Sequence, residues 1–489
     1  ASNIWTIRVA DGTYKPDTTG LVDPRPAAFS PFAFFHISSL IGGYAGCGAP
    51  DPDARDPAIN QTILSGDIGV IGDVTDNCYH VVFANGVESA LMDGFTLTGG
   101  NANGPGGNWK DFAGGARFIG SPIVRNCVFE VNNATSGAGG AFCRRSGMGT
   151  GGQFHRCIFR NNTASGFGGG VWVEGQASVE NCLAVGNTAF SGGAAAYANG
   201  TSALTMTNCT ITANDSGNST TSGALLLNDS ASLTLRNSIL WDNTAPTGTV
   251  TQKQIRVNSS GSVIVTYSVV QDDDPNDVSV YAGTANLDDN PRLDANSILK
   301  IGSPAIDSGE NDAVVGDADL DGAPRRVDDV GMADTGLGTA PIVDMGAYEF
   351  QGTTVAWGAC CSGDACGAIC EEFVAQAACL TPFVWTEGAM CSAVCSADAR
   401  CRLPAGQVFR DMVSDVDADF RLADDFVPSA SPITTVCWWG VYRELIVNEL
   451  DCGPGPGDSF TITYFTDASA RPSSEISSQT VTPTKPNAG

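Results

Sequence analysis

The chain has 489 residues, of which 42% are hydrophobic and 16% are charged, and its formal net charge is −28. The hydrophobic content excludes a chain that is disordered by composition. The acidic balance argues against nucleic acid as a partner, because phosphate binding needs clustered Lys and Arg. The 59 glycines and the few charged residues favour strands and tight turns over amphipathic helices.

The two ends of the sequence indicate a secreted fragment. Residues 1–4 already have the pattern of a strand, and no signal peptide precedes them. The chain ends at Gly489, shortly after another strand-like stretch. We expect both ends to be cut from a longer precursor that is extracellular or displayed at the cell surface. No run of about 18 apolar residues occurs, so we expect no transmembrane segment in this fragment.

A short phrase recurs five times between Asn126 and Asn243. It consists of Asn (Arg in one copy), then Cys or Ser, and a second Asn later in the phrase. A repeat of this period predicts a solenoid. The Cys or Ser position steps by 30, 25, 27 and 29 residues and falls at Cys127, Cys157, Cys182, Cys209 and Ser238.

The residues around each Cys or Ser predict a strand with one inward face. The third residue before it and the second after it are apolar, and the second before it is mostly polar. This alternation has the period of a strand, and copies stacked about 4.8 Å apart would bury a continuous core. The cysteines are then small buried hydrophobes, with Cys143 outside the register, and neighbouring pairs could oxidise if their geometry allows. The outward slot is occupied by Arg125, His155, Glu180, Thr207 and Arg236.

Asparagine and glycine predict the turns between the strands. Asn tolerates a left-handed backbone, so its presence at both ends of the phrase indicates stacked Asn ladders in the turns. Gly permits a tight corner with close backbone approach. Two or three strands per coil of roughly 25 residues favour an all-β parallel β-helix. Gly-Gly-Ala or a variant of it occurs at residues 114–116, 139–141, 169–171, 192–194 and 222–224.

These phrases resemble the repeats of right-handed parallel β-helix proteins of bacteria. That group includes polymorphic outer-membrane proteins and, more distantly, pectate-lyase-like folds. The stretches 7–16, 41–46 and 62–67 also resemble the opening coil of such proteins. The resemblance covers residues 1–350 and implies the fold, whereas one fold of this kind hosts adhesins, lyases and hydrolases.

Residues 300–350 are expected to form an acidic closing segment. Residues 271–350 hold 18 acidic and 4 basic residues. Residues 302–309 and 344–350 resemble the end segment of secreted bacterial β-helix proteins, where it closes the last coil. A cap is physically required, because an open β-helix end exposes unpaired strand edges.

The closing segment also contains a pattern that matches half of a calcium loop. Carboxylates on alternate residues, followed by Gly322, can converge on one hard cation. A bidentate Glu is missing, so the alternative is an acidic surface turn in which Arg325 or Arg326 pairs with an Asp. Apart from Ca²⁺, we expect no cofactor. The candidate ligands are Asp317, Asp319, Asp321 and Asp328.

Two further modules are predicted after the solenoid. Eight cysteines between Cys360 and Cys401 indicate a small disulfide-rich module over residues 356–402, because zinc would need regularly spaced Cys pairs. Their connectivity stays open. Alternating aromatic and β-branched runs over residues 409–489 predict a partial antiparallel β-sandwich that the end of the fragment truncates.

Few residues could carry chemistry. The chain has 3 His and no G-x-S-x-G phrase, so Ser-His-Asp catalysis is not supported. A polysaccharide lyase must neutralise a uronic carboxylate and abstract the adjacent proton. Arg144 and Arg145 could serve the first role, and His155 or Arg160 the second. The alternative is a solvated face balanced by neighbouring Glu residues.

Two functions follow from this sequence. The favoured one is a secreted or cell-surface structural or adhesive β-helix that contacts glycans or other surface ligands. It rests on the nearly neutral repeats, with 10 basic and 8 acidic residues over 91–270, and on the missing catalytic set. The alternative is a polysaccharide lyase or hydrolase that acts on acidic polysaccharide along one face of the β-helix.

Overall fold

The computed structural model describes residues 5–16, 37–106, 109–145, 150–217, 223–272, 281, 283–352 and five strands beyond residue 356. The chain divides into two compact units, Ala1–Ala356 and Trp357–Gly489. Among the described residues of the first unit, the helical elements are short: α1 (Val250–Gln254) and the 3-10 helix η1 (Asn311–Ala313). No helix of the described part is long and apolar enough to cross a membrane.

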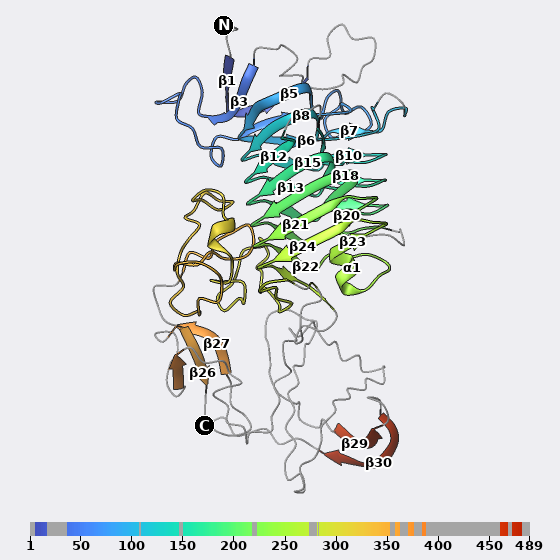
Figure 1. Cartoon of the computed structure of the whole chain (residues 1–489), viewed down its shortest axis with the longest axis vertical. Coiled ribbons are helices and arrows are strands. Elements are labelled where there is room, and N and C mark those ends of the chain that lie inside the picture. The colour runs from blue at the N-terminus through green and yellow to red at the C-terminus, as the bar shows by residue number, and fades with distance from the viewer. Residues whose placement is uncertain are drawn as a thin grey trace. The chain divides into compact units, whose positions relative to one another are not determined.

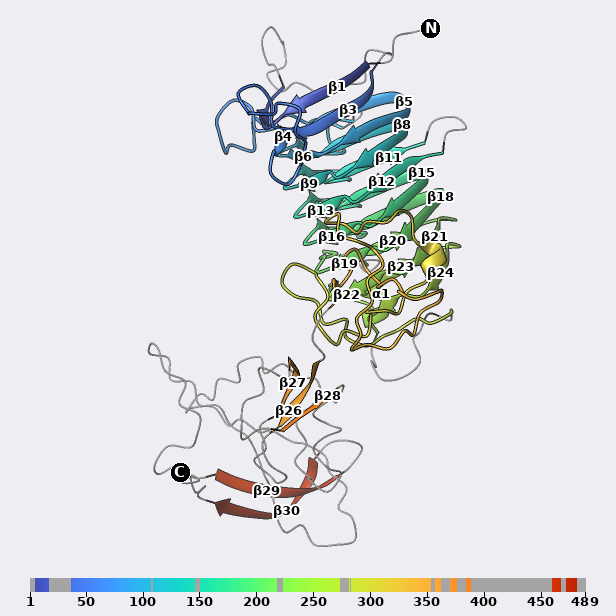
Figure 2. The same ribbon diagram turned by 90° about the vertical axis from the view of Figure 1, so that its left-hand side faces the viewer.

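The strands of the first unit form a parallel β-helix with three sheets (Figures 1 and 2). Strands pair in parallel with their equivalents in the coils before and after, so the predicted parallel β-helix is confirmed. Sheet A contains β1 (Trp5–Ala10), β3 (Ile37–Tyr44), β5 (Val82–Asp93), β8 (Ala116–Arg125), β11 (Ala141–Arg144), β12 (Gly152–His155), β15 (Val171–Glu180), β18 (Ala196–Thr207), β20 (Leu225–Leu227), β21 (Ser232–Arg236), β23 (Ile255–Val257) and β24 (Ser262–Thr266). Sheet B contains β2 (Gly12–Tyr14), β4 (Thr62–Ser65), β6 (Phe95–Thr98), β9 (Val128–Glu130), β13 (Ile158–Arg160), β16 (Leu183–Val185), β19 (Thr210–Thr212), β22 (Ile239–Trp241) and β25 (Val269–Val270). Sheet C contains β7 (Asn101–Ala102), β10 (Asn133–Ala134), β14 (Thr163–Ala164) and β17 (Thr188–Ala189).

The repeats stack in the predicted register. Phe129, Phe159, Ala184, Ile211 and Leu240 follow one another along sheet B. Each of these side chains is at most 7% exposed. The rings of Phe129 and Phe159 stack with their centroids 4.9 Å apart. The apolar positions of the phrase therefore fill the core, as the alternation predicts.

The Cys or Ser of each phrase is buried and also bonds the backbone. Its Sγ or Oγ donates to the carbonyl oxygen two residues earlier, as Ser238 does to Arg236 at 2.7 Å. This shared bond explains why Ser can replace Cys. The same bond is made by Cys127, Cys157, Cys182 and Cys209.

No disulfide forms among the cysteines of the β-helix. All seven cysteines between residues 5 and 352 are free thiols, and six of them are buried. Burial raises the pKa of Cys127 and Cys143 to about 12. A thiol with so high a pKa is a poor nucleophile. The interpretation of these cysteines as small buried hydrophobes is confirmed.

The two Asn of each phrase have different roles. The first has a left-handed backbone, with φ of 51° at Asn181 and 50° at Asn208. At the other end of the phrase the left-handed residue is the one before the Asn, for example Val131 or Ala213. The prediction of left-handed Asn at both ends was therefore wrong for the second Asn. Its amide is needed for hydrogen bonds between coils.

The second Asn of each phrase forms a buried amide ladder. In the first four copies Nδ2 donates to the Oδ1 of the Asn in the next coil, at 2.9 to 3.1 Å, and in the last copy Asn243 Nδ2 donates to Gln254 Oε1. The same Oδ1 accepts the backbone N–H of the preceding Asn, which satisfies a polar group that no strand partner reaches. The predicted ladder is confirmed. Its members, each at most 3% exposed, are Asn132, Asn162, Asn187, Asn214 and Asn243.

The glycine corners are confirmed in two coils and misaligned in a third. A Cβ at Gly140 or Gly170 would lie 2.5 Å from a carbonyl oxygen of the next coil. The prediction placed residues 192–194 at this corner, but the backbone aligns Gly170 with Ala195. Gly193 instead takes the left-handed position, with φ of 68°. Gly serves both positions, so the sequence pattern could not separate them.

The closing segment covers the side of the β-helix, which differs from the prediction that it closes the last coil. Figures 1 and 2 show residues 300–350, in yellow, beside the green coils. Leu183 packs against Leu320 and Tyr348, and Ile239 packs in a cluster with Met345. The physical reason is that the outer face of sheet B carries apolar residues on β16, β22 and β25, among them Leu183, Ile239 and Val269, and these must be buried.

The strands described in the second unit are antiparallel. β26 (Trp357–Cys361) lies between β27 (Cys370–Ala375) and β28 (Val384–Glu387). β29 (Phe460–Asp467) pairs with β30 (Pro472–Val481). The predicted disulfides and most of the predicted sandwich lie outside the described residues, so both stay predictions.

The buried His80 predicts acid sensitivity of the N-terminal coils. It is 4% exposed and its Nδ1 lies 2.8 Å from the carbonyl oxygen of Ala113. Burial lowers its pKa from 6.5 to about 4. The Ala113 carbonyl and Asp111 oppose this shift, whereas Arg117 and Lys110 add to it. The unfolded chain therefore binds a proton at His80 below pH 6.5, whereas the folded chain binds this proton only below about pH 4.

We expect the free energy of unfolding to fall by about 2–3 kcal/mol through His80 between pH 7 and pH 4.5. Urea denaturation at the two pH values measures this loss. His80→Gln keeps a donor for the Ala113 carbonyl but does not titrate, so its loss should be smaller by that amount. Equal losses in the two proteins would contradict the assignment.

Candidate functional site

The basic residues that could carry lyase chemistry all have partners. Arg144 Nε lies 3.5 Å from Glu174 Oε2, its neighbour across the strands of sheet A. Arg145 Nη1 donates to Gln176 Oε1 at 3.0 Å. Both guanidinium groups therefore already have protein partners, and neither is free to neutralise the carboxylate of an acidic sugar.

The other two candidates lie on different sheets. His155 Nδ1 is 2.9 Å from Glu180 Oε2 on sheet A. Arg160, on sheet B, donates from Nε to Glu130 Oε2 at 2.7 Å. His155 and Glu180 do stack in the predicted outward slot, next to Arg125 and Thr207. The arrangement is a set of cross-strand ion pairs, which fits the alternative of a balanced, solvated face.

The predicted calcium ligands have separate surroundings. Asp319 is buried, and its two oxygens accept the N–H groups of Ala323 and Glu349 at 2.9 and 3.0 Å. Asp317 is exposed and lies 3.7 Å from Arg326 Nη1. Asp321 is also exposed, and burial of part of its carboxyl raises its pKa. Asp328 groups with other residues, described below. A calcium ion bound by Asp317, Asp319, Asp321 and Asp328 stays a prediction.

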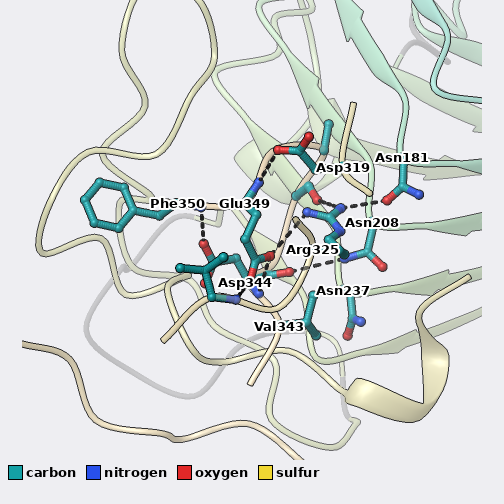
Figure 3. A network of polar contacts seen from close by, with 12 residues as sticks. Asn181, Asn208, Asn237, Asp319, Arg325, Val343, Asp344, Glu349 and Phe350 are labelled. Atoms are coloured by element: carbon teal, nitrogen blue, oxygen red, sulfur yellow. Dashed lines mark hydrogen bonds and ion pairs between the residues drawn. The ribbon is translucent and has the colours of Figure 1, made fainter. Parts of the chain in front are cut away.

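Arg325 lies at the centre of the contact between the closing segment and the coils (Figure 3). It is fully buried, and its Nη2 donates to Asn181 Oδ1 at 2.8 Å and to the carbonyl oxygen of Gly346 at 2.6 Å. Its Nη1 lies 3.5 Å from Glu349 Oε2. Arg325 therefore pairs with a buried Glu, whereas Arg326 pairs with the exposed Asp317, as the surface-turn alternative expected for one of the two arginines.

Buried carboxylates surround this guanidinium. Burial raises the pKa of Glu349 to about 8, although Arg325 and two backbone N–H groups lower it. Burial and the neighbouring Glu349 raise the pKa of Asp344 well above its usual range. Arg325 keeps its proton in proteins, so it supplies the positive charge that these groups need. The first Asn of the phrase completes the contact, since Asn208 and Asn237 donate to the carbonyl oxygens of Asp344 and Glu310.

A second carboxylate group lies in the same segment. One oxygen each from Asp307, Asp328 and Asp334 lie within 4.8 Å of one another. Asp307 is fully buried, whereas the other two are exposed. Burial and the neighbouring carboxylates raise the pKa of Asp307 to about 7, against the N–H of Asp329.

An aromatic cluster lies on the outer face of sheet A. Arg117, Phe142, Trp172 and Tyr197 follow one another in register across neighbouring strands. Loop residues add further rings, with centroids 4.9 Å apart for Phe112 and Phe142. We define the aromatic cluster as Trp109, Phe112, Phe142, Phe167, Trp172 and Tyr197.

Trp109 is the exposed member of the aromatic cluster. Its side chain is 40% exposed, and its ring stacks on Phe142 at 6.3 Å. The Arg117 guanidinium lies 4.8 Å from the Trp109 ring and 5.1 Å from the Phe83 ring. The buried donors Trp172 Nε1 and Arg117 Nε have no hydrogen-bond partner. The aromatic cluster and the neighbouring Arg117 thus combine one exposed ring face with two N–H donors that have no partner.

Residues 152–312 match the family model described as right handed beta helix region. This match agrees with the parallel coils of the structure. The first unit of the chain is thus a β-helix of stacked repeats, and the match describes it as right-handed over residues 152–312. No curated protein and no solved structure matches it.

Sequence reasoning missed three features of this β-helix. The residue directly after each Cys or Ser points outward but is apolar at Leu183 and Ile239, which signals a covered face. The aromatic cluster left a weaker signal in the sequence, which was one aromatic residue per coil at equivalent positions of sheet A. No local signal in the sequence indicates that Asp307 and Asp334 come together, because the two residues lie far apart in the chain and belong to no common motif.

Proposed function

We propose that this protein is an extracellular or cell-surface β-helix that binds carbohydrate through the aromatic cluster. The observation that carries the proposal is the half-exposed Trp109, held on Phe142 and beside Arg117. An aromatic ring whose one face is fixed by packing offers the other face to the C–H groups of a sugar ring.

The surroundings of Trp109 fit a neutral or weakly acidic sugar. Binding sites combine apolar surface with a few polar groups that fix orientation. Arg117 and Lys110 supply positive charge beside the rings, and Lys110 Nζ lies 5.0 Å from the centroid of Tyr79. The unused donors of Trp172 and Arg117 could bond hydroxyl groups after small side-chain movements.

The alternative function is a lyase or hydrolase that acts on acidic polysaccharide. The pairing of Arg144 with Glu174 and of Arg160 with Glu130 favours binding over catalysis. A lyase would need a cation free to neutralise the substrate carboxylate and a base beside it. The two functions therefore predict different results when the protein is incubated with polysaccharide. The enzyme would release sugar products, whereas the binding protein would release none.

Trp109→Ala is expected to weaken carbohydrate binding about tenfold, because it removes the exposed stacking face. The measurement is the amount of protein retained by a panel of insoluble and immobilised polysaccharides. Phe190→Ala is the matched control, since Phe190 is 55% exposed and makes no ring contact with the cluster. Its binding should equal that of the unchanged protein.

Two outcomes would count against the proposal. The first is a panel in which no polysaccharide retains the protein, or in which Trp109→Ala binds as tightly as Phe190→Ala. The second is ultraviolet absorbance from unsaturated sugar product that disappears in Arg144→Ala. That result would establish the lyase instead.

A further inference from the structure

We propose that Asp307, Asp328 and Asp334 bind one Ca²⁺ ion that holds two loops of the closing segment together. One oxygen of each carboxylate lies within 4.8 Å of the other two. Calcium coordinates oxygens at about 2.4 Å, so opposite ligands in its shell lie about 4.8 Å apart. The three oxygens therefore fit into a single shell.

Asp307 provides the second, independent observation for this site. Its side chain is fully buried, yet its Oδ1 accepts no hydrogen bond. Its Oδ2 accepts only a long bond of 3.3 Å from the Asp329 N–H. A buried acceptor without a partner costs free energy, and a cation would satisfy it.

The charge balance points in the same direction. Within the described residues, none of the three carboxylates pairs with Lys, Arg or His. Like charges this close repel one another unless a cation lies between them. Carboxylate oxygens are hard ligands, which favour Ca²⁺ or Mg²⁺ over softer metals. The exposure of Asp328 and Asp334 leaves room for water to complete the flexible shell of calcium.

The site would connect two loops that already touch. The N–H groups of Thr335 and Gly336 both donate to the carbonyl oxygen of Asp307. The hydroxyls of Ser308 and Thr335 lie 2.7 Å apart. A cation here would fix residues 328–336 against residues 307–308. This site differs from the candidate set of Asp317, Asp319, Asp321 and Asp328, with which it shares only Asp328.

The full chain, stripped with EDTA and dialysed into 0.15 M salt, is titrated with CaCl₂ in a calorimeter. The double variant Asp328→Asn/Asp334→Asn should lose one bound Ca²⁺ per chain, or bind it at least about tenfold more weakly. Both positions are exposed, so this variant should keep its fold, which circular dichroism checks. MgCl₂ in place of CaCl₂ should bind more weakly, because Mg²⁺ demands a tighter octahedral shell.

Asp317→Asn is the control, because Asp317 is exposed, acidic and part of the other candidate set. It should bind Ca²⁺ with unchanged stoichiometry and affinity. The proposal is overturned if the double variant binds as the unchanged protein does. It is also overturned if Asp317→Asn alone removes the bound ion, which would place calcium in the turn at residues 317–322.

Discussion

Replacing Asn187 with alanine is expected to lower the free energy of unfolding of the β-helix by about 3–5 kcal/mol, because several buried polar groups lose their partners at once. Asn187 Oδ1 accepts from both the backbone N–H and the Nδ2 of Asn162, at 3.1 and 3.0 Å. Its Nδ2 donates to Asn214 Oδ1 and to the carbonyl oxygen of Phe159. Water cannot replace these bonds in the interior.

Urea denaturation followed by circular dichroism measures this loss. Asn296→Ala is the matched control, since Asn296 lies in an exposed turn and should change the free energy by no more than about 0.5 kcal/mol. If Asn187→Ala were as stable as Asn296→Ala, the ladder would contribute nothing beyond the strand pairing.

Arg325→Met is expected to release the closing segment at a cost of about 3–5 kcal/mol, because it leaves the buried Glu349 carboxyl and the Gly346 carbonyl oxygen without the guanidinium that they contact. Glu349 and Asp344 are both fully or nearly fully buried beside this guanidinium. The loss of the bond to Asn181 Oδ1 also removes a link to the coils. Hydrogen exchange over residues 300–350 should then become faster, while the core of sheet A stays protected.

Neighbouring variants separate the charge effect from a loss of volume. Arg326→Met alters an exposed Arg whose partner Asp317 lies 3.7 Å away, so it should change little. Arg325→Met combined with Glu349→Leu removes both charges and should recover part of the stability. Equal exchange rates in Arg325→Met and Arg326→Met would show that the closing segment is held by its apolar contacts alone.

The orientation of the first Asn in each phrase links these two predictions. Asn181, Asn208 and Asn237 have left-handed backbones, and their amides reach the closing segment. The second Asn of the same phrases bonds the coils to one another. In these phrases the second Asn therefore bonds neighbouring coils to one another, and the first Asn bonds the coils to the closing segment.

The local pattern of the sequence was sufficient for the solenoid and for the inward residues. Spacing near 27 residues and alternation of period two depend only on neighbours along the chain, and identical coils repeat the same packing. The apolar positions, the buried cysteines and the Asn ladder followed from this regularity. The corner at residues 192–195 was misaligned, because Gly fits two different backbone positions and its presence does not choose between them.

Only the tertiary structure decided where the closing segment lies and which polar groups meet there. Arg325 and Asn181 are separated by 144 positions in the chain, and nothing local links them. By contrast, each candidate basic residue pairs with a Glu or Gln one coil away, a contact that the period of the repeat brings into reach. The sequence by itself thus determined the repeating core, whose contacts recur with its period. The contacts between the closing segment and the coils, and the group of Asp307, Asp328 and Asp334, are made once, between segments without a shared period, so folding alone brought them together.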